Sequence, residues 1–366
     1  MRSQAWIVDV LLSAESMSSG LRGSVLVVSM LLTGMVVASA APAADGSDWG
    51  SLQLLGREIG PGQKSKFAFI PDRTFEASYL NTPVFAARGA SPGPTLCLTA
   101  GVHGDELNGV EVARRAFAGA DAATLRGTLI ALPAINAEGV RAGNRYLSDR
   151  RDLNRSFPGK AGGSVAALIA YAVFTGVLGH CDALIDLHTA SNNRDNLPQI
   201  RADLSKPAIR ELAIHFGLGI VIGGAGPNGS LRSEAAKAGI AAIIYEAGEP
   251  YRFQEEEIAR GVQGVRNVMA YLGMTNEADT QVPETRVYEK SRWVRAGVGH
   301  GGFFFPAAEL GSIVQAGDRL GSVVDPFTDE AFEVIAPIPG TIVGMAVPQP
   351  VLSGYGLFHL AWQAGD

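Results

Sequence analysis

Apolar residues follow two repeating patterns in the middle of the chain. Short continuous apolar runs, which are typical of buried strands, occur at 95–100, 128–134, 183–187, 219–222 and 241–245. Apolar residues at helical spacing occur between and around these runs, at 105–118, 165–178, 206–216, 230–238 and 254–272. Strands that alternate with helices indicate an α/β fold in which helices flank a mixed, mostly parallel sheet. We predict such a domain over residues 91–280.

The pattern changes near residue 285. Helical spacing stops there, and short β runs separated by Gly and Pro continue to the end of the chain. Segments 311–321 and 334–343 resemble the barrel-sandwich domains that carry biotin or lipoate. A carrier domain needs an attachment lysine, and no lysine follows Lys290. The prediction is therefore an all-β barrel-sandwich domain over 285–366 without a carrier function.

The first 40 residues have the features of a signal peptide. Arg22 precedes the apolar run 25–37, and Ala38-Ser39-Ala40 matches the small-x-small pattern of a cleavage site. The run is shorter than the roughly 20 apolar residues that span a bilayer. We therefore expect an exported, periplasmic protein, with an uncleaved membrane anchor as the alternative. Residues 41–90 are expected to form a lead-in with one short strand over 66–70.

Polar residues follow the ends of three predicted strands. His103 and Glu106 are three residues apart, so both can point the same way from a turn or an opening helix. His188 ends the next apolar run, and the ends of parallel strands meet at one edge of a sheet. Two histidines and one carboxylate form an open zinc site that leaves a position for water. Glu246, at the end of a third strand, supplies a carboxylate that is not a ligand and can act as general base.

Two arginines and an asparagine complete this set. The anionic intermediate of amide hydrolysis needs positive charge beside the developing oxyanion, and Arg145 can supply it by polarising the scissile carbonyl. Asn154 and Arg155 can clamp a substrate carboxylate with forked hydrogen bonds. The residues together predict a metal-dependent hydrolase that binds one Zn²⁺ per chain.

These residues belong to five short motifs. In chain order they are His-Gly-Asp-Glu at 103–106, Arg-Tyr at 145–146, Asp-Leu-Asn-Arg at 152–155, Asp-Leu-His at 186–188 and Glu-x-Gly at 246–248. Together they resemble the succinylglutamate desuccinylase/aspartoacylase family, a branch of the zinc carboxypeptidase-like hydrolases. The resemblance covers about 90–275, and the family's C-terminal β domain matches 285–366. By this resemblance, His103, Glu106 and His188 are the zinc ligands, and Glu246 is the general base. Arg145 is the arginine that polarises the carbonyl, and Asn154 and Arg155 bind a substrate carboxylate.

The expected function is removal of an acyl group from an N-acylated amino acid or small amine, by attack of a zinc-bound water. A carboxypeptidase or amidase that acts on short cell-wall peptides is one alternative. A catalytically silent binding protein is another, although a pure binder would not need Glu246 and Arg145. The formal charge of −6 argues against nucleic acid as a partner. A membrane partner is expected only if the N-terminal segment stays uncleaved.

Other charged residues near the motifs have plainer interpretations. Asp105 is expected to be a charge at a helix start, and Asp152 to orient its loop. Asp186 could equally support a metal ligand or make a structural hydrogen bond. Glu249 competes with Glu246 for the role of base. Surface positions are the default expectation for three further arginines, Arg194, Arg201 and Arg232, with the alternative that one of them reaches the substrate.

Two further expectations concern the cysteines and the C-terminal region. Cys97 and Cys181 lie six and seven residues before His103 and His188, at similar depth on strands that would be neighbours. A disulfide is possible in an exported protein, but we slightly favour two free, buried cysteines. The Gly-rich segment 300–305 suits a loop over the mouth of the site.

Overall fold

The computed structural model describes residues 49–70, 81–276, 283–363 and 365. The predicted signal peptide lies outside these residues. The described residues all belong to one compact unit. Among them, no helix is both long enough and apolar enough to cross a membrane.

The centre of the molecule is a group of four parallel strands in the order β6-β5-β7-β10. Their bounds are Arg126–Leu132 for β6, Ser91–Ala100 for β5, Ala183–His188 for β7 and Ala241–Gly248 for β10. All four were predicted as buried strands, and almost all side chains of β6, β7, β10 and the second half of β5 are buried. The parallel arrangement confirms the α/β prediction and brings the carboxyl ends of β5, β7 and β10 to one edge.

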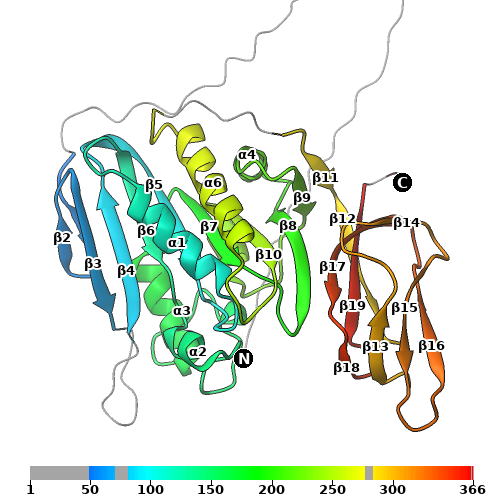
Figure 1. Cartoon of the computed structure of the whole chain (residues 1–366). Coiled ribbons are helices and arrows are strands. Elements are labelled where there is room, and N and C mark those ends of the chain that lie inside the picture. Colours follow the sequence, from blue (N-terminus) through cyan, green and yellow to red (C-terminus); the bar gives the residue numbers. More distant parts are fainter. Residues whose placement is uncertain (1–48, 71–80, 277–282, 364, 366) are drawn as a thin grey trace, which may run out of the picture. The chain divides into compact units, whose positions relative to one another are not determined.

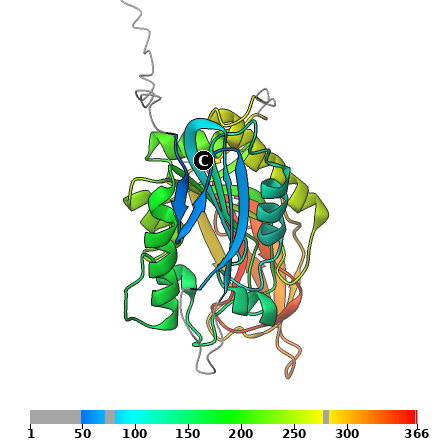
Figure 2. The same cartoon turned by 90° about the vertical axis from the view of Figure 1, so that its left-hand side faces the viewer.

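Helices cover both faces of this sheet, as Figure 2 shows. Three helices pack with Leu96 and Leu98 on one face, and they are α1 (Asn108–Gly119), α4 (Pro207–His215) and α6 (Glu255–Tyr271). Two helices pack with Cys97 on the other face, and they are α3 (Val165–Gly176) and α5 (Leu231–Lys237). Successive strand residues point to opposite faces, so apolar residues at consecutive positions are buried by both helical layers.

The segment before β5 contains more strands than the one expected. β3 (Gln63–Phe69) and β4 (Thr82–Arg88) extend the central sheet antiparallel beyond β6. β1 (Leu52–Leu54) and β2 (Arg57–Ile59) pair as a separate ribbon. The strand expected over 66–70 is confirmed as part of β3, but the expectation that it would be the single strand of this segment was wrong. Strands this short depend on their pairing partners, which their own sequence does not reveal.

On the other side, the sheet continues into the C-terminal region. β8 (Arg194–Ala202) is antiparallel to β10, and β17 (Gly340–Ala346) is antiparallel to β8. β9 (Ile220–Gly223) and β11 (Arg286–Tyr288) add a parallel branch beside β8. The sheet thus continues from the α/β region into the C-terminal region, and the domain boundaries predicted near residues 280 and 285 stay predictions.

The C-terminal region consists of two antiparallel layers with a core between them, as predicted (Figure 1). One layer contains β17 together with β12 (Lys290–Arg295), β14 (Ile313–Val314) and β19 (Gly356–Trp362). The other contains β13 (Gly302–Pro306), β15 (Arg319–Val324), β16 (Ala331–Ile335) and β18 (Gln349–Val351). Phe304 meets Phe358 edge to face, with ring centroids 5.6 Å apart. This contact joins the two layers at the centre of their core.

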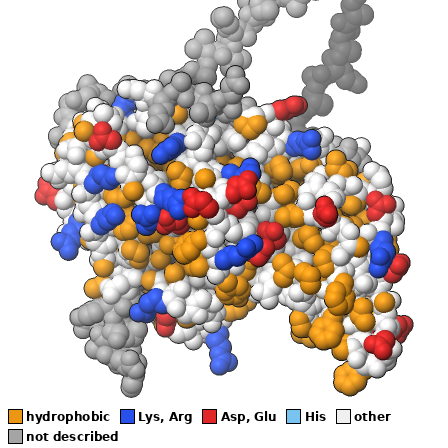
Figure 3. Space-filling view, viewed as in Figure 1, with side chains coloured by type: hydrophobic (Ala, Val, Ile, Leu, Met, Phe, Trp, Pro, Cys, Tyr) orange, Lys and Arg blue, Asp and Glu red, His pale blue; other side chains and the backbone are white. Residues whose placement is uncertain are grey.

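The outer surface differs between the two regions. Figure 3 shows charged side chains of both signs mixed over the helices, whereas hydrophobic atoms gather over the C-terminal strands. On the helices, Arg115 bonds Glu111 at 2.7 Å and also pairs with Glu255. On the C-terminal strands, Phe303 and Phe305 are 44% and 51% exposed. Ion pairs within α1 and between α1 and α6 therefore mark the helical face of the α/β region.

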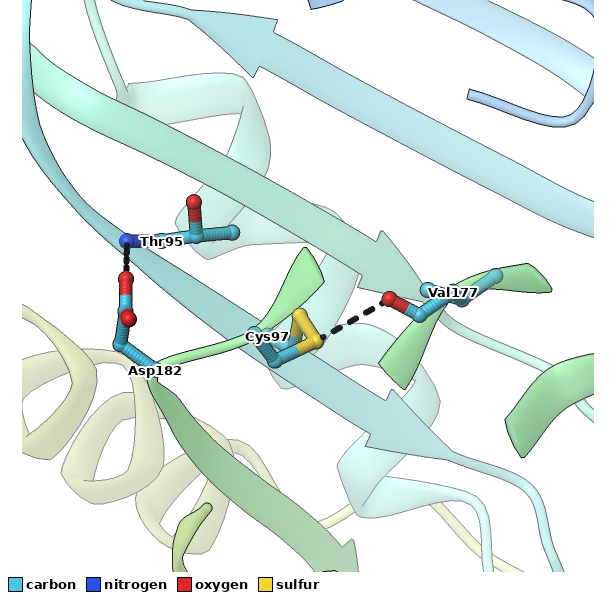
Figure 4. Close-up of a disulfide and its surroundings, with 5 residues drawn as sticks. Thr95, Cys97, Val177 and Asp182 are labelled. Atoms are coloured by element: carbon cyan, nitrogen blue, oxygen red, sulfur yellow. Dashed lines mark hydrogen bonds between the residues drawn. A yellow bond between two sulfur atoms is a disulfide. The ribbon is translucent and has the colours of Figure 1, made fainter. Parts of the chain in front are cut away.

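Cys97 and Cys181 form a disulfide (Figure 4). Their Cα atoms lie 5.8 Å apart, within the usual range for a bridge. Cys97 is on β5, opposite Leu184 of the neighbouring strand β7, and Cys181 comes just before β7. The expected neighbouring strands are confirmed, but the slight preference for free cysteines was wrong. The reason is that residue 181 turns into β7 directly beside Cys97, which sequence spacing does not show.

Candidate active site

A tight turn after β5 places the first pair of site residues. The chain leaves β5 at Ala100 and enters α1 at Asn108, and His103 and Glu106 lie between. A Cβ at Gly104 would lie 2.0 Å from the backbone of Gly139 in the neighbouring helix α2 (Ala137–Ala142). Only glycine permits this approach, which explains the glycine that follows His103.

Three side chains from two strand ends meet below this turn. Nδ1 of His103 lies 2.8 Å from one Glu106 oxygen, and Nδ1 of His188 lies 2.7 Å from the other. The three side chains are buried, and one ligand atom from each lies within 4.8 Å of the others. The predicted ligand set is thus brought together in a geometry that can hold a metal ion.

A second carboxylate lies behind each histidine. Nε2 of His188 donates to Asp186 at 2.9 Å, and Asp186 also accepts from Thr99 at 2.7 Å. Nε2 of His103 donates to Asp152 at 3.2 Å. These partners favour protonated Nε2 atoms and leave both Nδ1 lone pairs facing the site, the arrangement that supports metal-bound histidines. Asp186 therefore supports the ligand residue His188 and also makes a structural hydrogen bond, the two roles considered from the sequence.

The electrostatics of this cluster match a cation site. Burial alone would raise the pKa of Glu106, but His103 and His188 hold it well below its usual value. Burial alone would lower the pKa of His188, but Asp186 and Glu106 raise it well above its usual value. The carboxylates around the imidazoles therefore favour positive charge at the place where the three ligand atoms meet.

Glu246 lies beside the ligand set without belonging to it. It pairs with His188 in the register of β10 and β7. Asn196 donates to one oxygen at 2.7 Å, and Arg201 lies 3.1 Å from the other. Glu249, its rival for the role of base, bonds Arg252 at 3.0 Å and is not among the residues that line the site cavity.

Arg145 reaches the ligand set from the loop after α2. It donates to Glu106 and to Asp152, both at 3.2 Å. The hydroxyl of Ser191 bonds both Arg145 and Glu106. Burial alone would lower the pKa of Arg145, but Glu106 and Asp152 raise it. A guanidinium is therefore held beside the place where a reacting carbonyl would lie.

Asn154 and Arg155 lie on a short 3-10 turn, Leu153–Arg155, that Asp152 caps. Asn154 is buried and accepts a hydrogen bond from the backbone of Leu231, at the start of α5, at 2.8 Å. Arg155 is exposed, and both side chains line the site cavity. The predicted carboxylate-binding pair thus faces the same cavity as the ligand set, and Asp152 orients its loop as expected.

The site cavity has a volume of about 200 Å³ and contains three arginines that were expected at the surface. Arg194, Arg201 and Arg232 all line it, so the default expectation of surface positions was wrong, and all three lie where at most one was expected. Arg194 and Arg201 lie on β8, a strand hidden in the sequence by its polar residues. The Arg194 guanidinium lies 4.9 Å from the ring centroid of Trp293, which also lines the cavity. Recognition of β8 as a strand would have revealed Arg194 and Arg201.

Two other expectations fail. Asp105 is not a charge at a helix start, because α1 begins at Asn108 and both Asp105 oxygens are buried without a hydrogen-bond partner in the described part of the chain. Segment 300–305 is not a loop over the mouth. His300 stacks on Phe332, and residues 302–306 form strand β13. Trp293 contributes instead to the cavity from the C-terminal region, because its strand β12 belongs to the same sheet as β8, whereas β13 belongs to the other layer.

Known proteins share this sequence pattern and fold. The model of the succinylglutamate desuccinylase/aspartoacylase catalytic domain matches residues 92–272. The N-alpha-acetyl-L-2,4-diaminobutyric acid deacetylase of Halomonas elongata is 29% identical over 247 residues, which are 64% of this chain and 71% of that protein. The product-bound ectoine utilization protein EutE (DoeB) of Ruegeria pomeroyi has a TM-score of 0.76 and 24% identity, over 83% of this chain and 98% of that one.

A further solved structure has the same fold. The succinylglutamate desuccinylase/aspartoacylase of Rhodobacter sphaeroides has a TM-score of 0.75 and 24% identity, over 84% of this chain and 98% of that one. The α/β sheet is the fold of these solved structures, and the His-Glu-His cluster can hold a metal ion. The chain belongs to the succinylglutamate desuccinylase/aspartoacylase family, a branch of the zinc carboxypeptidase-like hydrolases. It is a deacylase of that family with an intact metal site.

Proposed function

We propose that the protein is an exported, zinc-dependent deacylase that hydrolyses the amide bond of a small N-acyl amino acid. The observation that carries this proposal is the position of Glu246. It lies opposite His188 and lines the same cavity as the three ligand residues, yet its oxygens bond Asn196 and Arg201. A carboxylate held beside a metal site, but not in it, is what a hydrolase needs as general base.

Zinc fits the residues present. His103, Glu106 and His188 would hold it, since two imidazoles and one carboxylate are a usual donor set for catalytic zinc. When bound, zinc supplies Lewis acidity, which lowers the pKa of water and polarises a carbonyl. Asp152 and Asp186 fix the two imidazoles so that the Nδ1 atoms face the site.

The other residues of the site have separate roles in the hydrolysis. Glu246 takes a proton from the attacking water and passes it to the amide nitrogen as the amine leaves. Its contacts with Asn196 and Arg201 fix the direction of the carboxylate. The guanidinium of Arg145 stabilises the negative charge that develops on the carbonyl oxygen. Arg155, at the rim of the cavity, binds a carboxylate of the substrate.

The size and composition of the cavity support a small acylated substrate. Its volume of about 200 Å³ suits a small molecule, and Trp293 lines it from the C-terminal region. The relative from Halomonas elongata is named as a deacetylase of an acetylated amino acid. Together these observations favour an N-acyl amino acid over a cell-wall peptide.

The disulfide between Cys97 and Cys181 supports the exported part of the proposal. Disulfides persist in oxidising compartments and are rare in the bacterial cytosol. N-terminal sequencing of the protein from the periplasmic fraction should give a chain that begins just after Ala40. Intact protein in the cytoplasmic fraction would contradict export without affecting the proposed chemistry.

A substrate screen tests the proposed reaction. Purified, zinc-loaded protein should release the free amino acid from N-acetyl or other short N-acyl amino acids. Short peptides without an acyl group serve as the comparison, and release of their C-terminal residue at a higher rate would favour a carboxypeptidase. Hydrolysis of neither class would contradict the proposal.

A further inference from the structure

The loop between β7 and β8 brings a hydroxyl group into the site that was not among the predicted site residues. Ser191 lies three residues after the ligand residue His188, is partly buried and lines the site cavity. Its hydroxyl accepts a hydrogen bond from Arg145 and donates one to Glu106. One side chain thus connects the guanidinium that faces the reacting carbonyl with a carboxylate of the ligand set.

The chemistry of the two partners fixes the direction of this hydroxyl. A guanidinium can only donate hydrogen bonds, and an ionised carboxylate can only accept them. Glu106 is ionised, because the neighbouring histidines hold its pKa well below the usual value. The single proton of Ser191 therefore points at Glu106, and a lone pair points at Arg145. Hydrogen bonds to charged groups are the stronger kind, so Ser191 holds both partners in place.

Arg145 depends on few contacts for its direction. One guanidinium nitrogen bonds Asp152 at 3.2 Å, and the other bonds Ser191 and lies 3.2 Å from Glu106. As a metal ligand, Glu106 has much of its charge neutralised by the cation. Asp152 and Ser191 are then the contacts that aim the guanidinium. A donor that is aimed before the reaction starts needs no reorganisation when charge develops on the carbonyl oxygen.

The same loop also holds Glu106. The backbone N–H of Thr189 donates to one oxygen of Glu106 at 3.2 Å, and Ser191 donates to the other. Hydrogen bonds of this kind orient the side chains that bind a metal. His188 belongs to the same stretch of chain, since it ends β7 just before Thr189. Residues 188–191 therefore supply one metal ligand, orient a second and aim Arg145.

The C-terminal region fixes the other end of this loop. Asn192 and Asn193 have φ angles of 55° and 52°, a left-handed conformation that asparagine adopts more readily than most residues. The backbone oxygen of Asn193 accepts from the backbone of Val347 at 3.1 Å and from the side chain of Gln349 at 2.7 Å. The hydroxyl of Tyr355 donates to the backbone oxygen of Asn192. Three residues of the C-terminal region thus hold the two residues that follow Ser191.

We propose that Ser191 is a positioning residue that aims Arg145 and orients Glu106, and that the C-terminal region acts on the reaction by fixing the loop that carries Ser191. The hydroxyl keeps its own proton and transfers none. This inference rests on the proposed deacylase function, because the reaction is where the aim of Arg145 has its effect. Its influence on Glu106 is independent of any substrate.

Two substitutions at Ser191 separate its hydrogen bonds from its packing. With an N-acetyl amino acid that the wild type hydrolyses, Ser191→Ala should lower kcat by about 10-fold to 100-fold, the scale of a hydrogen bond to a charged group. KM should change little, because charge on the carbonyl oxygen develops only in the transition state. Ser191→Thr keeps the hydroxyl and should keep most of the activity. Ser205→Ala, an exposed serine that bonds the Asp203 carboxylate at 2.6 Å, is the control. Equal losses in Ser191→Thr and Ser191→Ala, with both proteins folded in thermal unfolding, would overturn the role of the hydroxyl.

A double-mutant cycle tests whether Ser191 acts through Arg145. If it does, most of the loss in kcat caused by Ser191→Ala should disappear when Arg145 is already replaced by Ala. A loss of the same size in both backgrounds would overturn the link between the two residues.

Tyr355→Phe tests the part of the C-terminal region. It removes only the hydroxyl that holds Asn192, so kcat should fall about fivefold, the scale of a neutral hydrogen bond. Tyr171→Phe, which changes an exposed tyrosine outside the site cavity, should have no effect. Full activity in Tyr355→Phe would overturn the role given to the C-terminal region.

Zinc affinity provides a readout that needs no substrate. In competition with a chelator, Ser191→Ala should bind zinc about tenfold more weakly than the wild type, because Glu106 loses a hydrogen bond that orients it. Ser191→Thr and Ser205→Ala should bind it as the wild type does. Unchanged affinity in Ser191→Ala would overturn the role of Ser191 toward Glu106. If the wild type hydrolyses no N-acyl substrate, the deacylase proposal fails, and the zinc competition alone decides whether Ser191 orients Glu106.

Discussion

The two cavities that share Arg201 and Arg232 differ in how their charged groups are paired. In the first cavity, both ring nitrogens of His103 and of His188 face carboxylates, and Glu246 uses both of its oxygens. In the second cavity, which Arg292, Arg295 and His359 also line, no carboxylate lies among the described lining residues, and the buried Nδ1 of His359 lacks a partner in the described part of the chain.

The paired groups of the first cavity hold each other in position, so the fold alone prepares the metal ligands and the base. The wall of the second cavity, which Arg292, Arg295 and His359 complete, has no such network of carboxylates among its described residues.

The largest expected effect concerns the base in the first cavity. Glu246→Gln keeps the size of the side chain but cannot take a proton, so kcat should fall by about 10² to 10⁴ with metal content unchanged. Steady-state kinetics with metal analysis of the same sample measures both. Glu249→Gln is the matched control, because its side chain lies outside the cavity. Full activity in Glu246→Gln and a large loss in Glu249→Gln would assign the role to the other residue.

The next effect concerns stability and the disulfide between Cys97 of β5 and Cys181 before β7, the two strands that precede the metal ligands. Replacing both Cys97 and Cys181 by Ala should lower the free energy of unfolding by roughly 2 to 4 kcal/mol, because the bridge closes a long loop in the unfolded chain. Urea denaturation with and without reductant measures this loss, and reductant should affect the wild type only. Two thiols that alkylate in the unreduced, unfolded wild type would show that the bridge does not form.

A smaller effect is expected for zinc affinity when the carboxylate that bonds the ligand residue His188 is replaced. Asp186→Asn removes the negative charge that holds Nε2 of His188, so affinity for zinc should fall by about 10-fold to 100-fold. Competition with a zinc chelator measures the affinity. Asp318→Asn, an exposed carboxylate of the C-terminal region, should leave it unchanged. Equal affinities in all three proteins would make Asp186 a structural residue only.

The smallest effect tests the acid-binding side of the first cavity. Arg155→Lys keeps the charge but loses the forked donor geometry. KM should rise about tenfold for N-acyl amino acids and much less for the matching amino acid amides. Arg151→Lys, an exposed neighbour on the same loop, is the control. Equal changes for acids and amides would show that Arg155 does not bind the carboxylate.

Sequence reasoning succeeded where a residue's position follows from local pattern. The apolar runs before His188 and Glu246 predicted buried strands, and parallel strands bring their ends together. The ligand residues could therefore be grouped from the sequence alone. The order of the motifs also sufficed to recognise the family, because their spacing spans most of the α/β region.

Sequence reasoning failed where long-range pairing decides the position. β8 contains polar residues because it borders the cavity, so its pattern does not resemble that of a buried strand. Arg201 was consequently expected at the surface, although the pairing of β8 with β10 brings it into an ion pair with Glu246. Trp293 and His359 depend on the contact between β17 and β8, which joins residues about 150 positions apart in the chain. The arginine-rich wall could not be foreseen for the same reason.

Metal analysis of the purified protein and one ligand variant tests the central claim most directly. The wild type should contain about one zinc per chain, and His188→Ala should lose most of it, because one of three protein ligands is gone. His180→Ala, which changes an exposed histidine outside the site, should keep the full amount. Equal zinc in His188→Ala and the wild type, or a wild type that does not take up zinc, would contradict the metal site on which the proposed function depends.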